Sequence, residues 1–183
     1  MSSSPSLWAR YRTLRRERRW VRWLEDGAFL VLVLSAVFAW QTRNHVASGE
    51  PLPAFSFADL EGKTWRSEDL RGKPVVLHLW APWCGVCKQE TGTFSRLHES
   101  LGDSAHVVSV ALSYRSVSDV QRFVRDYGAK YPVLLGDDQF QEALRVDSFP
   151  TTYVLTPDGR ISSSAVGLVT TAGLRMRLWR AKL

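Results

Sequence analysis

Two cysteines separated by two residues are the part of the chain best suited to chemistry. They are Cys84 and Cys87 in the stretch WAPWCGVCKQE (residues 80–90), and the sequence contains no other cysteine. A disulfide stabilises a protein mainly by closing a long loop of the unfolded chain, so this pair is a poor structural brace. Zinc requires four ligands, and neither a second CxxC nor a paired-histidine motif is present. We therefore predict dithiol–disulfide exchange and no metal site.

The position of the pair predicts a different role for each cysteine. Residues 75–80 (VVLHLW) have the pattern of a buried strand, and the pattern becomes helical from Cys84 to about Leu101. Unpaired N–H groups and the helix dipole favour a thiolate at the helix start, so Cys84 is the predicted nucleophile. Cys87, one turn further along, is predicted to attack the resulting mixed disulfide and release the product.

Glu90 is the candidate proton acceptor for Cys87. It follows Cys87 by three residues, which places the two side chains on neighbouring parts of one helix surface. The carboxylate would take the proton directly or through water. An ordinary exposed glutamate beside Lys88 fits the spacing equally well, and the spacing alone leaves both interpretations open.

The segment Phe149-Pro150-Thr151 is a candidate substrate-binding loop. Most X-Pro bonds are trans, and the segment fits a simple turn. A cis bond would instead present a backbone edge on which a substrate peptide could pair as an added strand. Trp83, together with Trp80 and Pro82, would form the apolar rim of that groove, although core packing also explains Trp80.

The remaining pattern predicts an α/β fold with a mixed central sheet flanked by helices and preceded by a small β-hairpin. Strand-like runs alternate with helical ones, and the chain ends in a hairpin and a helix. The expected elements are a hairpin near residues 55–65, strands at 75–80, 107–112 and 132–135, helices at 84–101, 118–127 and 140–146, a second hairpin at 151–167, and a final helix at 170–179.

A charged tail and an apolar run precede this domain. Residues 1–26 carry seven arginines against three acidic residues, and residues 28–40 are apolar except for Ser35. A helix of that length covers about 20 Å of a hydrocarbon layer about 30 Å thick, so a full span would have to begin near Trp20. We predict a basic cytoplasmic tail (1–26), a transmembrane anchor or uncleaved signal (27–43), a linker (44–50) and a catalytic domain (51–183) exported to the periplasm. A cleaved signal peptide is the alternative.

The charge distribution argues against nucleic-acid binding. The formal net charge is +6, but the excess of basic residues lies at the two ends of the chain. A nucleic-acid-binding domain would carry a basic face on its folded body. The anchor would instead make membrane lipid a partner.

The motifs WAPWCGVCKQE, FPTTYVL and PDGRI together resemble those of the thioredoxin superfamily, specifically the membrane-tethered TlpA/ResA-like thiol-disulfide oxidoreductases of bacteria. The resemblance covers about residues 51–181, and the tail, AWQTR and GLRMRLW look closest to proteins related to the suppressor of copper sensitivity D. It implies a thioredoxin fold, a bacterial inner-membrane protein facing the periplasm, Cys84 attacking, Cys87 resolving, Glu90 assisting proton transfer and a cis Pro150. Thr91-Gly92 departs from the family, where a proline often follows soon after that glutamate.

The resemblance also implies partners and leaves two alternatives. We expect periplasmic cysteine-containing proteins as clients, a DsbD-like membrane electron donor, and no cofactor beyond the Cys84–Cys87 disulfide. Gly85-Val86 between the cysteines lacks the histidine of the strong oxidant DsbA, which favours a reductase or isomerase. A Cu(I)-handling module is the alternative. A thiol peroxidase is disfavoured, because peroxiredoxins have a threonine where this chain has Ala81.

Overall fold

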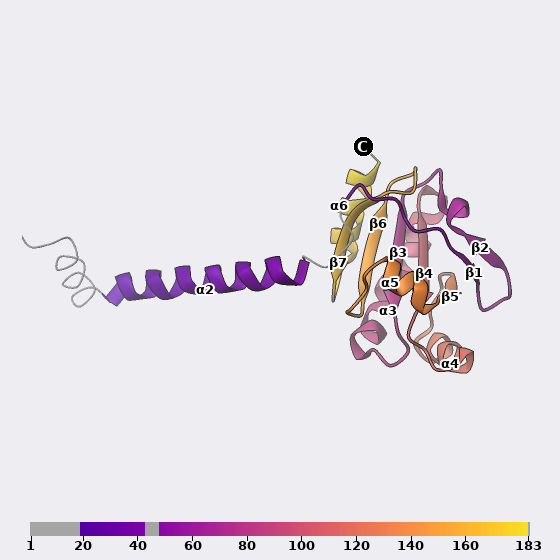
Figure 1. Cartoon of the computed structure of the whole chain (residues 1–183), viewed down its shortest axis with the longest axis horizontal. Helices are drawn as coiled ribbons and strands as arrows, with labels where there is room; N and C mark the ends of the chain where they lie inside the picture. The colour runs from indigo at the N-terminus through magenta and orange to yellow at the C-terminus, as the bar shows by residue number, and fades with distance from the viewer. Residues whose placement is uncertain (1–18, 43–47, 183) are drawn as a thin grey trace, which may run out of the picture. The chain divides into compact units, whose positions relative to one another are not determined.

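The computed structural model describes residues 19–42 and 48–182. They belong to two units that divide between Asn44 and His45. The described part of the first unit is the helix α2 (Arg19–Thr42) (Figure 1). Residues 1–18 of the predicted tail lie outside the described residues. So do residues 43–47, which include the end of the predicted anchor and most of the predicted linker.

Helix α2 contains the apolar run on which the anchor was predicted. In the parts of the chain that the structure describes, no helix combines the length and the apolar content that a membrane crossing needs. The predicted anchor at residues 27–43 is not supported by this finding.

The second unit is built on a five-stranded mixed sheet with the strand order β5-β4-β3-β6-β7. β4 is parallel to both β3 and β5, whereas β6 is antiparallel to both β3 and β7. The strands are β3 (Val75–Trp80), β4 (His106–Ala111), β5 (Val133–Leu135), β6 (Thr151–Leu155) and β7 (Ile161–Val166). The helices are α3 (Gly85–Leu101), α4 (Val117–Tyr127), α5 (Asp138–Ala143) and α6 (Thr171–Ala181), with short 3-10 turns η1 (Ser67–Leu70) and η2 (Gly102–Ser104).

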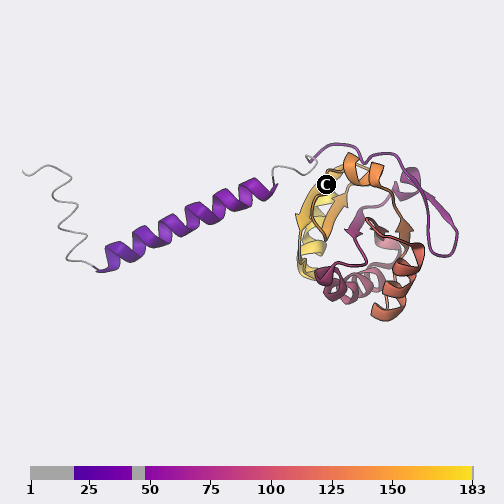
Figure 2. The ribbon, with the colours of Figure 1, turned by 60° about the horizontal axis from the view of Figure 1, so that its bottom comes forward.

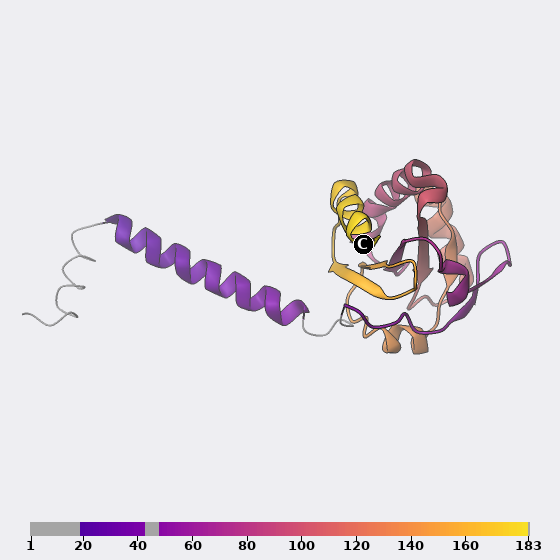
Figure 3. The same cartoon turned by 90° about the horizontal axis from the view of Figure 1, so that it is seen from above.

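Helices cover both faces of this sheet, so its central strands are buried on both faces. All six residues of β3 are buried. Val76 and Trp80 point to the face covered by α3, α4 and α6, whereas Leu77 and Leu79 point to the face covered by α5 and the N-terminal hairpin. Figure 3 shows α3 and α6 on one side of the sheet and α5 on the other. This two-sided burial explains why the run of residues 75–80 does not alternate between apolar and polar side chains.

A two-stranded hairpin, β1 (Ser56–Ala58) and β2 (Thr64–Arg66), precedes the sheet. It lies near the β5 edge of the domain (Figures 1 and 2), where Asp59 forms a bridge with Leu134. Inside its turn, the Asp59 carboxylate accepts hydrogen bonds from the N–H groups of Glu61 and Lys63 and from the Trp65 indole. Desolvation raises the pKa of Asp59, but these three hydrogen bonds and the charge of Lys63 together lower it below its usual value.

The architecture agrees with the predicted α/β class, mixed sheet and N-terminal hairpin, and the largest difference in bounds concerns one helix. Residues 140–146 were predicted as a helix, whereas α5 begins two residues earlier and ends three residues earlier. It begins early because the Asp137 carboxylate caps it by accepting a hydrogen bond from the Phe140 N–H at 2.8 Å. It ends before Arg145, whose φ of 52° is incompatible with a right-handed helix.

Candidate active site

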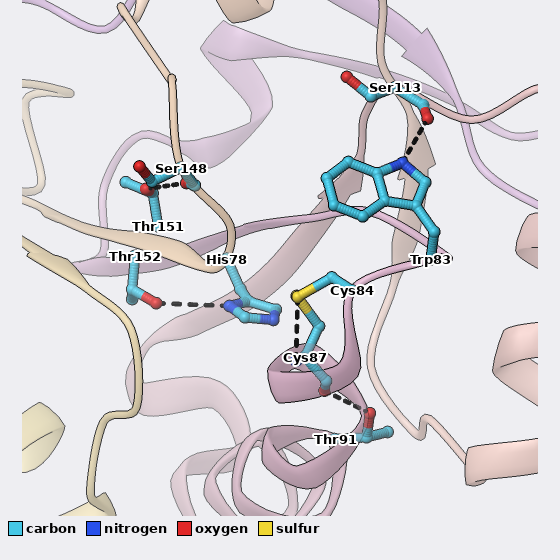
Figure 4. The surroundings of a disulfide bond; sticks show 9 residues. All are labelled: His78, Trp83, Cys84, Cys87, Thr91, Ser113, Ser148, Thr151 and Thr152. Carbon is cyan, nitrogen blue, oxygen red and sulfur yellow. Dashed lines mark hydrogen bonds between the residues drawn. A yellow bond between two sulfur atoms is a disulfide. The ribbon is translucent and has the colours of Figure 1, made fainter.

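The two cysteines form a disulfide at the N-terminus of α3, with the sulfur atoms 2.06 Å apart. β3 ends at Trp80, and a tight turn closed by the Cys84 N–H and the Ala81 carbonyl starts the helix. Cys84 occupies the N-cap position, and its Sγ accepts a hydrogen bond from the Cys87 N–H at 3.1 Å (Figure 4). The first N–H groups of a helix have no intrahelical partner, so this end of α3 favours negative charge on Cys84 once the disulfide is reduced.

Both sulfur-bearing side chains are largely protected from solvent. Cys84 is 5% exposed and Cys87 is 1% exposed, whereas the neighbouring Trp83 is 64% exposed. Thr91 lies directly beneath the pair and donates its hydroxyl to the Cys87 carbonyl at 3.2 Å. A reagent therefore reaches the pair from the side of Cys84, next to the surface turn.

Glu90 is buried, which rules out the interpretation of this residue as an ordinary exposed glutamate. Its side chain is 1% exposed. Oε1 accepts a hydrogen bond of 2.5 Å from the Val169 N–H in the connection to α6, and Oε2 has no hydrogen-bond partner among the described residues. Desolvation raises the pKa of Glu90 to about 7, although the Val169 bond lowers it. Such a carboxyl group exchanges its proton near neutral pH, as a general base or acid requires.

The Phe149–Pro150 peptide bond is cis, the less common isomer that the sequence left open. Thr151, which is buried, donates its hydroxyl to the Ser148 carbonyl at 2.7 Å and so ties this loop together (Figure 4). Thr151 is also the first residue of β6, where it pairs with Leu79 near the end of β3. The loop and the cysteine turn therefore leave the sheet from adjacent strands, at the same end.

Trp83 and Phe149 come together although 66 positions separate them in the sequence. Their ring centroids are 5.6 Å apart in an edge-to-face arrangement. The Trp83 indole N–H donates to the Ser113 carbonyl at 3.0 Å, which fixes the ring despite its exposure. Trp80, by contrast, is buried against Phe123, so core packing is the correct explanation for it.

Some groups at the site escaped the sequence analysis. His78 is buried, stacks on Phe94 with centroids 3.9 Å apart, and has Nδ1 3.3 Å from the Thr152 hydroxyl. Desolvation lowers the pKa of His78 to about 3, so it stays neutral in the physiological range. The Ser113 carbonyl and the Val169 N–H were missed because they are backbone groups, and side-chain patterns give no signal for them.

The described residues do not form a metal site. Within residues 19–42 and 48–182, no group of three or more His, Cys, Asp or Glu side chains is arranged to hold a metal ion. The two cysteines therefore have no third side chain of these types assembled with them in the described parts.

Comparison with known proteins identifies the family. The model of the AhpC/TSA family matches residues 48–164, more than half of the chain. The chain belongs to this family. Among curated relatives, the thioredoxin-like protein YneN of Bacillus subtilis is 30% identical over 166 residues, covering 86% of this chain and 96% of that protein. The thiol-disulfide oxidoreductase ResA of the same organism is 29% identical, covering 86% of this chain and 90% of that protein.

The solved structures agree with the fold. A thiol:disulfide interchange protein of the thioredoxin family from Chlorobium tepidum matches with a TM-score of 0.65 and 23% identity, covering 74% of this chain and 98% of that one. The predicted thioredoxin fold and the resemblance to ResA-like proteins are thus confirmed, and this AhpC/TSA family member is a thiol-disulfide oxidoreductase. Its predicted closeness to the suppressor of copper sensitivity D stays a prediction.

Proposed function

We propose that this oxidoreductase transfers electrons from its own dithiol to disulfides in exported client proteins, with Cys84 attacking, Cys87 resolving and Glu90 moving the proton. One observation carries the proposal: Cys84 caps α3 beside the surface turn, and the more deeply buried Cys87 donates its N–H to the Cys84 sulfur. The proximity and the difference in access fit an attacking and a resolving cysteine.

The reaction begins with the reduced protein. The Cys84 thiolate attacks one sulfur of the client disulfide, that S–S bond breaks, and the second client sulfur leaves as a thiolate. The Cys87 thiol gives its proton to the Glu90 carboxylate and attacks Cys84 Sγ. The mixed disulfide breaks, and the protein keeps the Cys84–Cys87 disulfide. The client leaves with two thiols: one of its thiolates takes up the proton held by Glu90 and the other takes a proton from water. Two electrons have then passed from the protein to the client.

Client binding is proposed at the loop of Phe149, Pro150 and Thr151 and at Trp83. The edge-to-face contact between Phe149 and Trp83, and the pairing of Thr151 with Leu79 near the end of β3, support this location. An extended client segment would add its backbone next to Pro150, with apolar side chains against the two rings.

Reduction or isomerisation is favoured over oxidation, because Gly85-Val86 supplies no side-chain charge or hydrogen-bond donor to stabilise the Cys84 thiolate further. We expect the full-length protein, equilibrated with mixtures of reduced and oxidised dithiothreitol, to show a reduction potential nearer to about −270 mV than to about −120 mV. A value near the less negative limit would contradict the direction. Working as a reductant among exported proteins requires a membrane electron donor of the DsbD type to return two electrons per turnover.

We propose that the domain after residue 50 faces the periplasm. The arginine-rich start and the apolar residues 28–40 support this orientation. Protease added to cells with a permeabilised outer membrane should then degrade the domain while a cytoplasmic marker stays intact. Equal protection of the domain and the marker would contradict the proposal.

A further inference from the structure

A cavity of about 430 Å³ lies next to the redox site. Its walls come from the turn before Cys84, from the loop between β4 and α4, from α3 and from α4. Because Pro82 and Trp83 belong to this wall and directly precede Cys84, we refer to it as the Trp83 cavity.

Trp83 connects this cavity to the proposed client-binding loop. Its ring lines the cavity and also makes the edge-to-face contact with Phe149. The hydrogen bond to the Ser113 carbonyl joins the cysteine turn to the loop that carries Tyr114 and Arg115, two further lining residues. A client segment that crosses Trp83 from the Pro150 side therefore arrives at the Trp83 cavity.

Aromatic rings form the apolar part of the cavity. Phe123 is buried at its base, and Tyr127 lies 4.8 Å from it between ring centroids and is partly exposed. Tyr114 packs against the same core cluster. These rings offer an apolar surface to a client side chain.

The acidic residues that line the cavity have ion-pair partners, whereas two of its basic residues have none among the described residues. Its two lining carboxylates are already paired: Asp119 with Arg122 at 3.6 Å, and Asp126 with Arg125 at 3.7 Å. Asp119 also accepts a hydrogen bond from the Ser116 hydroxyl. The acidic residues that line the cavity therefore bring little uncompensated negative charge.

Two cations at the cavity remain without an acidic partner. Among the described residues, neither Arg115 nor Lys88 has a carboxylate within ion-pair distance, and the Lys88 ammonium lies 5.5 Å from the Tyr127 ring centroid. Asp137 and Asp138 are near enough to Tyr114 to raise its pKa, after desolvation, but they do not line the cavity. Asp137 is moreover occupied in capping α5.

We propose that the Trp83 cavity binds an acidic segment of the client, with a carboxylate held by Arg115 and Lys88 and an apolar side chain on the rings. The proposal rests on the proposed function, because it names the class of client that the Cys84–Cys87 pair serves. Charge complementarity of this kind selects partners and accelerates their encounter. A client cysteine with Asp or Glu a few residues away is thus preferred over one in a neutral segment.

The test compares two peptides that differ only in charge. Each carries one cysteine in a mixed disulfide with thionitrobenzoate, whose release is followed by absorbance; one peptide has glutamates flanking the cysteine and the other has glutamines. We expect the reduced full-length protein to react about 3- to 10-fold faster with the acidic peptide at low salt, and the preference to fall at high salt. The rate of each peptide with dithiothreitol corrects for its intrinsic reactivity.

Arg115→Gln and Lys88→Gln are the informative variants, and Arg96→Gln is the matched control, since Arg96 is an exposed residue of α3 that neither lines the cavity nor pairs with a carboxylate that does. All rates are divided by the rate of the same variant with uncharged dithiodipyridine, so that a change in Cys84 reactivity cancels. We expect the first two variants to lose the preference and the control to keep it. Equal rates for both peptides with the native protein would overturn the inference. Reaction with neither peptide would instead overturn the proposed function.

Discussion

Replacing Cys84 with serine is expected to lower the rate of insulin reduction at least about 100-fold, because a serine hydroxyl cannot replace the thiolate that attacks a disulfide. Cys87→Ser should behave differently. Its Cys84 can still attack, but the mixed disulfide has no resolving thiol, so a covalent complex with the client should accumulate and should be visible on a non-reducing gel.

Val86→Ser is the matched control for both variants, since it introduces the same side chain at an exposed position between the cysteines. It should retain insulin reduction. A Cys84→Ser variant as active as the native protein would refute the assignment of the nucleophile. A covalent client complex that accumulates with Cys84→Ser, and not with Cys87→Ser, would reverse the two roles.

The second expected result is that Glu90→Gln slows release of the mixed disulfide about 10- to 100-fold and removes the part of its pH dependence that has a midpoint near 7. In the native protein this step should accelerate as pH rises through the Glu90 pKa of about 7, because only the carboxylate accepts the Cys87 proton. Glutamine keeps the shape of the side chain but cannot accept that proton. Stopped-flow measurement of client release between pH 5 and pH 9 separates the two behaviours.

The same variant makes an independent prediction for stability. The pKa of Glu90 is raised in the folded protein from 4.5 to about 7, so between these values the folded state holds a proton that the unfolded state has lost. The free energy of unfolding therefore falls as pH rises across this window, by about 3 kcal/mol in total. In its disulfide form, Glu90→Gln should lack this loss and should be more stable than the native protein at pH 8, as urea unfolding would measure.

Glu99→Gln is the control for both measurements. Glu99 is also on α3, but it is exposed and pairs with Lys130 at 2.8 Å, which lowers its pKa by hydrogen bonding. Removing an exposed pair of this kind should change stability little and should not alter client release. If Glu90→Gln matched Glu99→Gln in both the pH profile of release and the pH profile of stability, Glu90 would not be the proton acceptor.

The sequence predicted those parts of the site that depend on local order. The apolar run of residues 75–80 predicted β3, and the two cysteines at its end predicted their own place at the start of α3. Both predictions held because neighbouring residues determine a strand, a turn and a helix start. Local patterns also predicted the two hairpins.

What the sequence could not determine arises from contacts between distant segments. Glu90 is held in its buried position by Val169, 79 residues away, whose N–H donates a hydrogen bond to one oxygen of the carboxylate. The position of the Trp83 ring depends on the Ser113 carbonyl, 30 residues away. Neither contact has a pattern within one element, so the spacing of Cys87 and Glu90 alone fits an exposed glutamate equally well.

The pairing of Leu79 with Thr151 holds the cysteine turn and the Pro150 loop at a fixed spacing, so that the residues of each can be changed independently. The cysteine turn and the Pro150 loop are anchored to neighbouring strands of one hydrogen-bonded ladder. Exchange of the two residues between the cysteines, or of the Phe149 side chain, therefore leaves the spacing between the anchor points unchanged. The reduction potential and the choice of client can therefore change separately, either among relatives or in a designed protein.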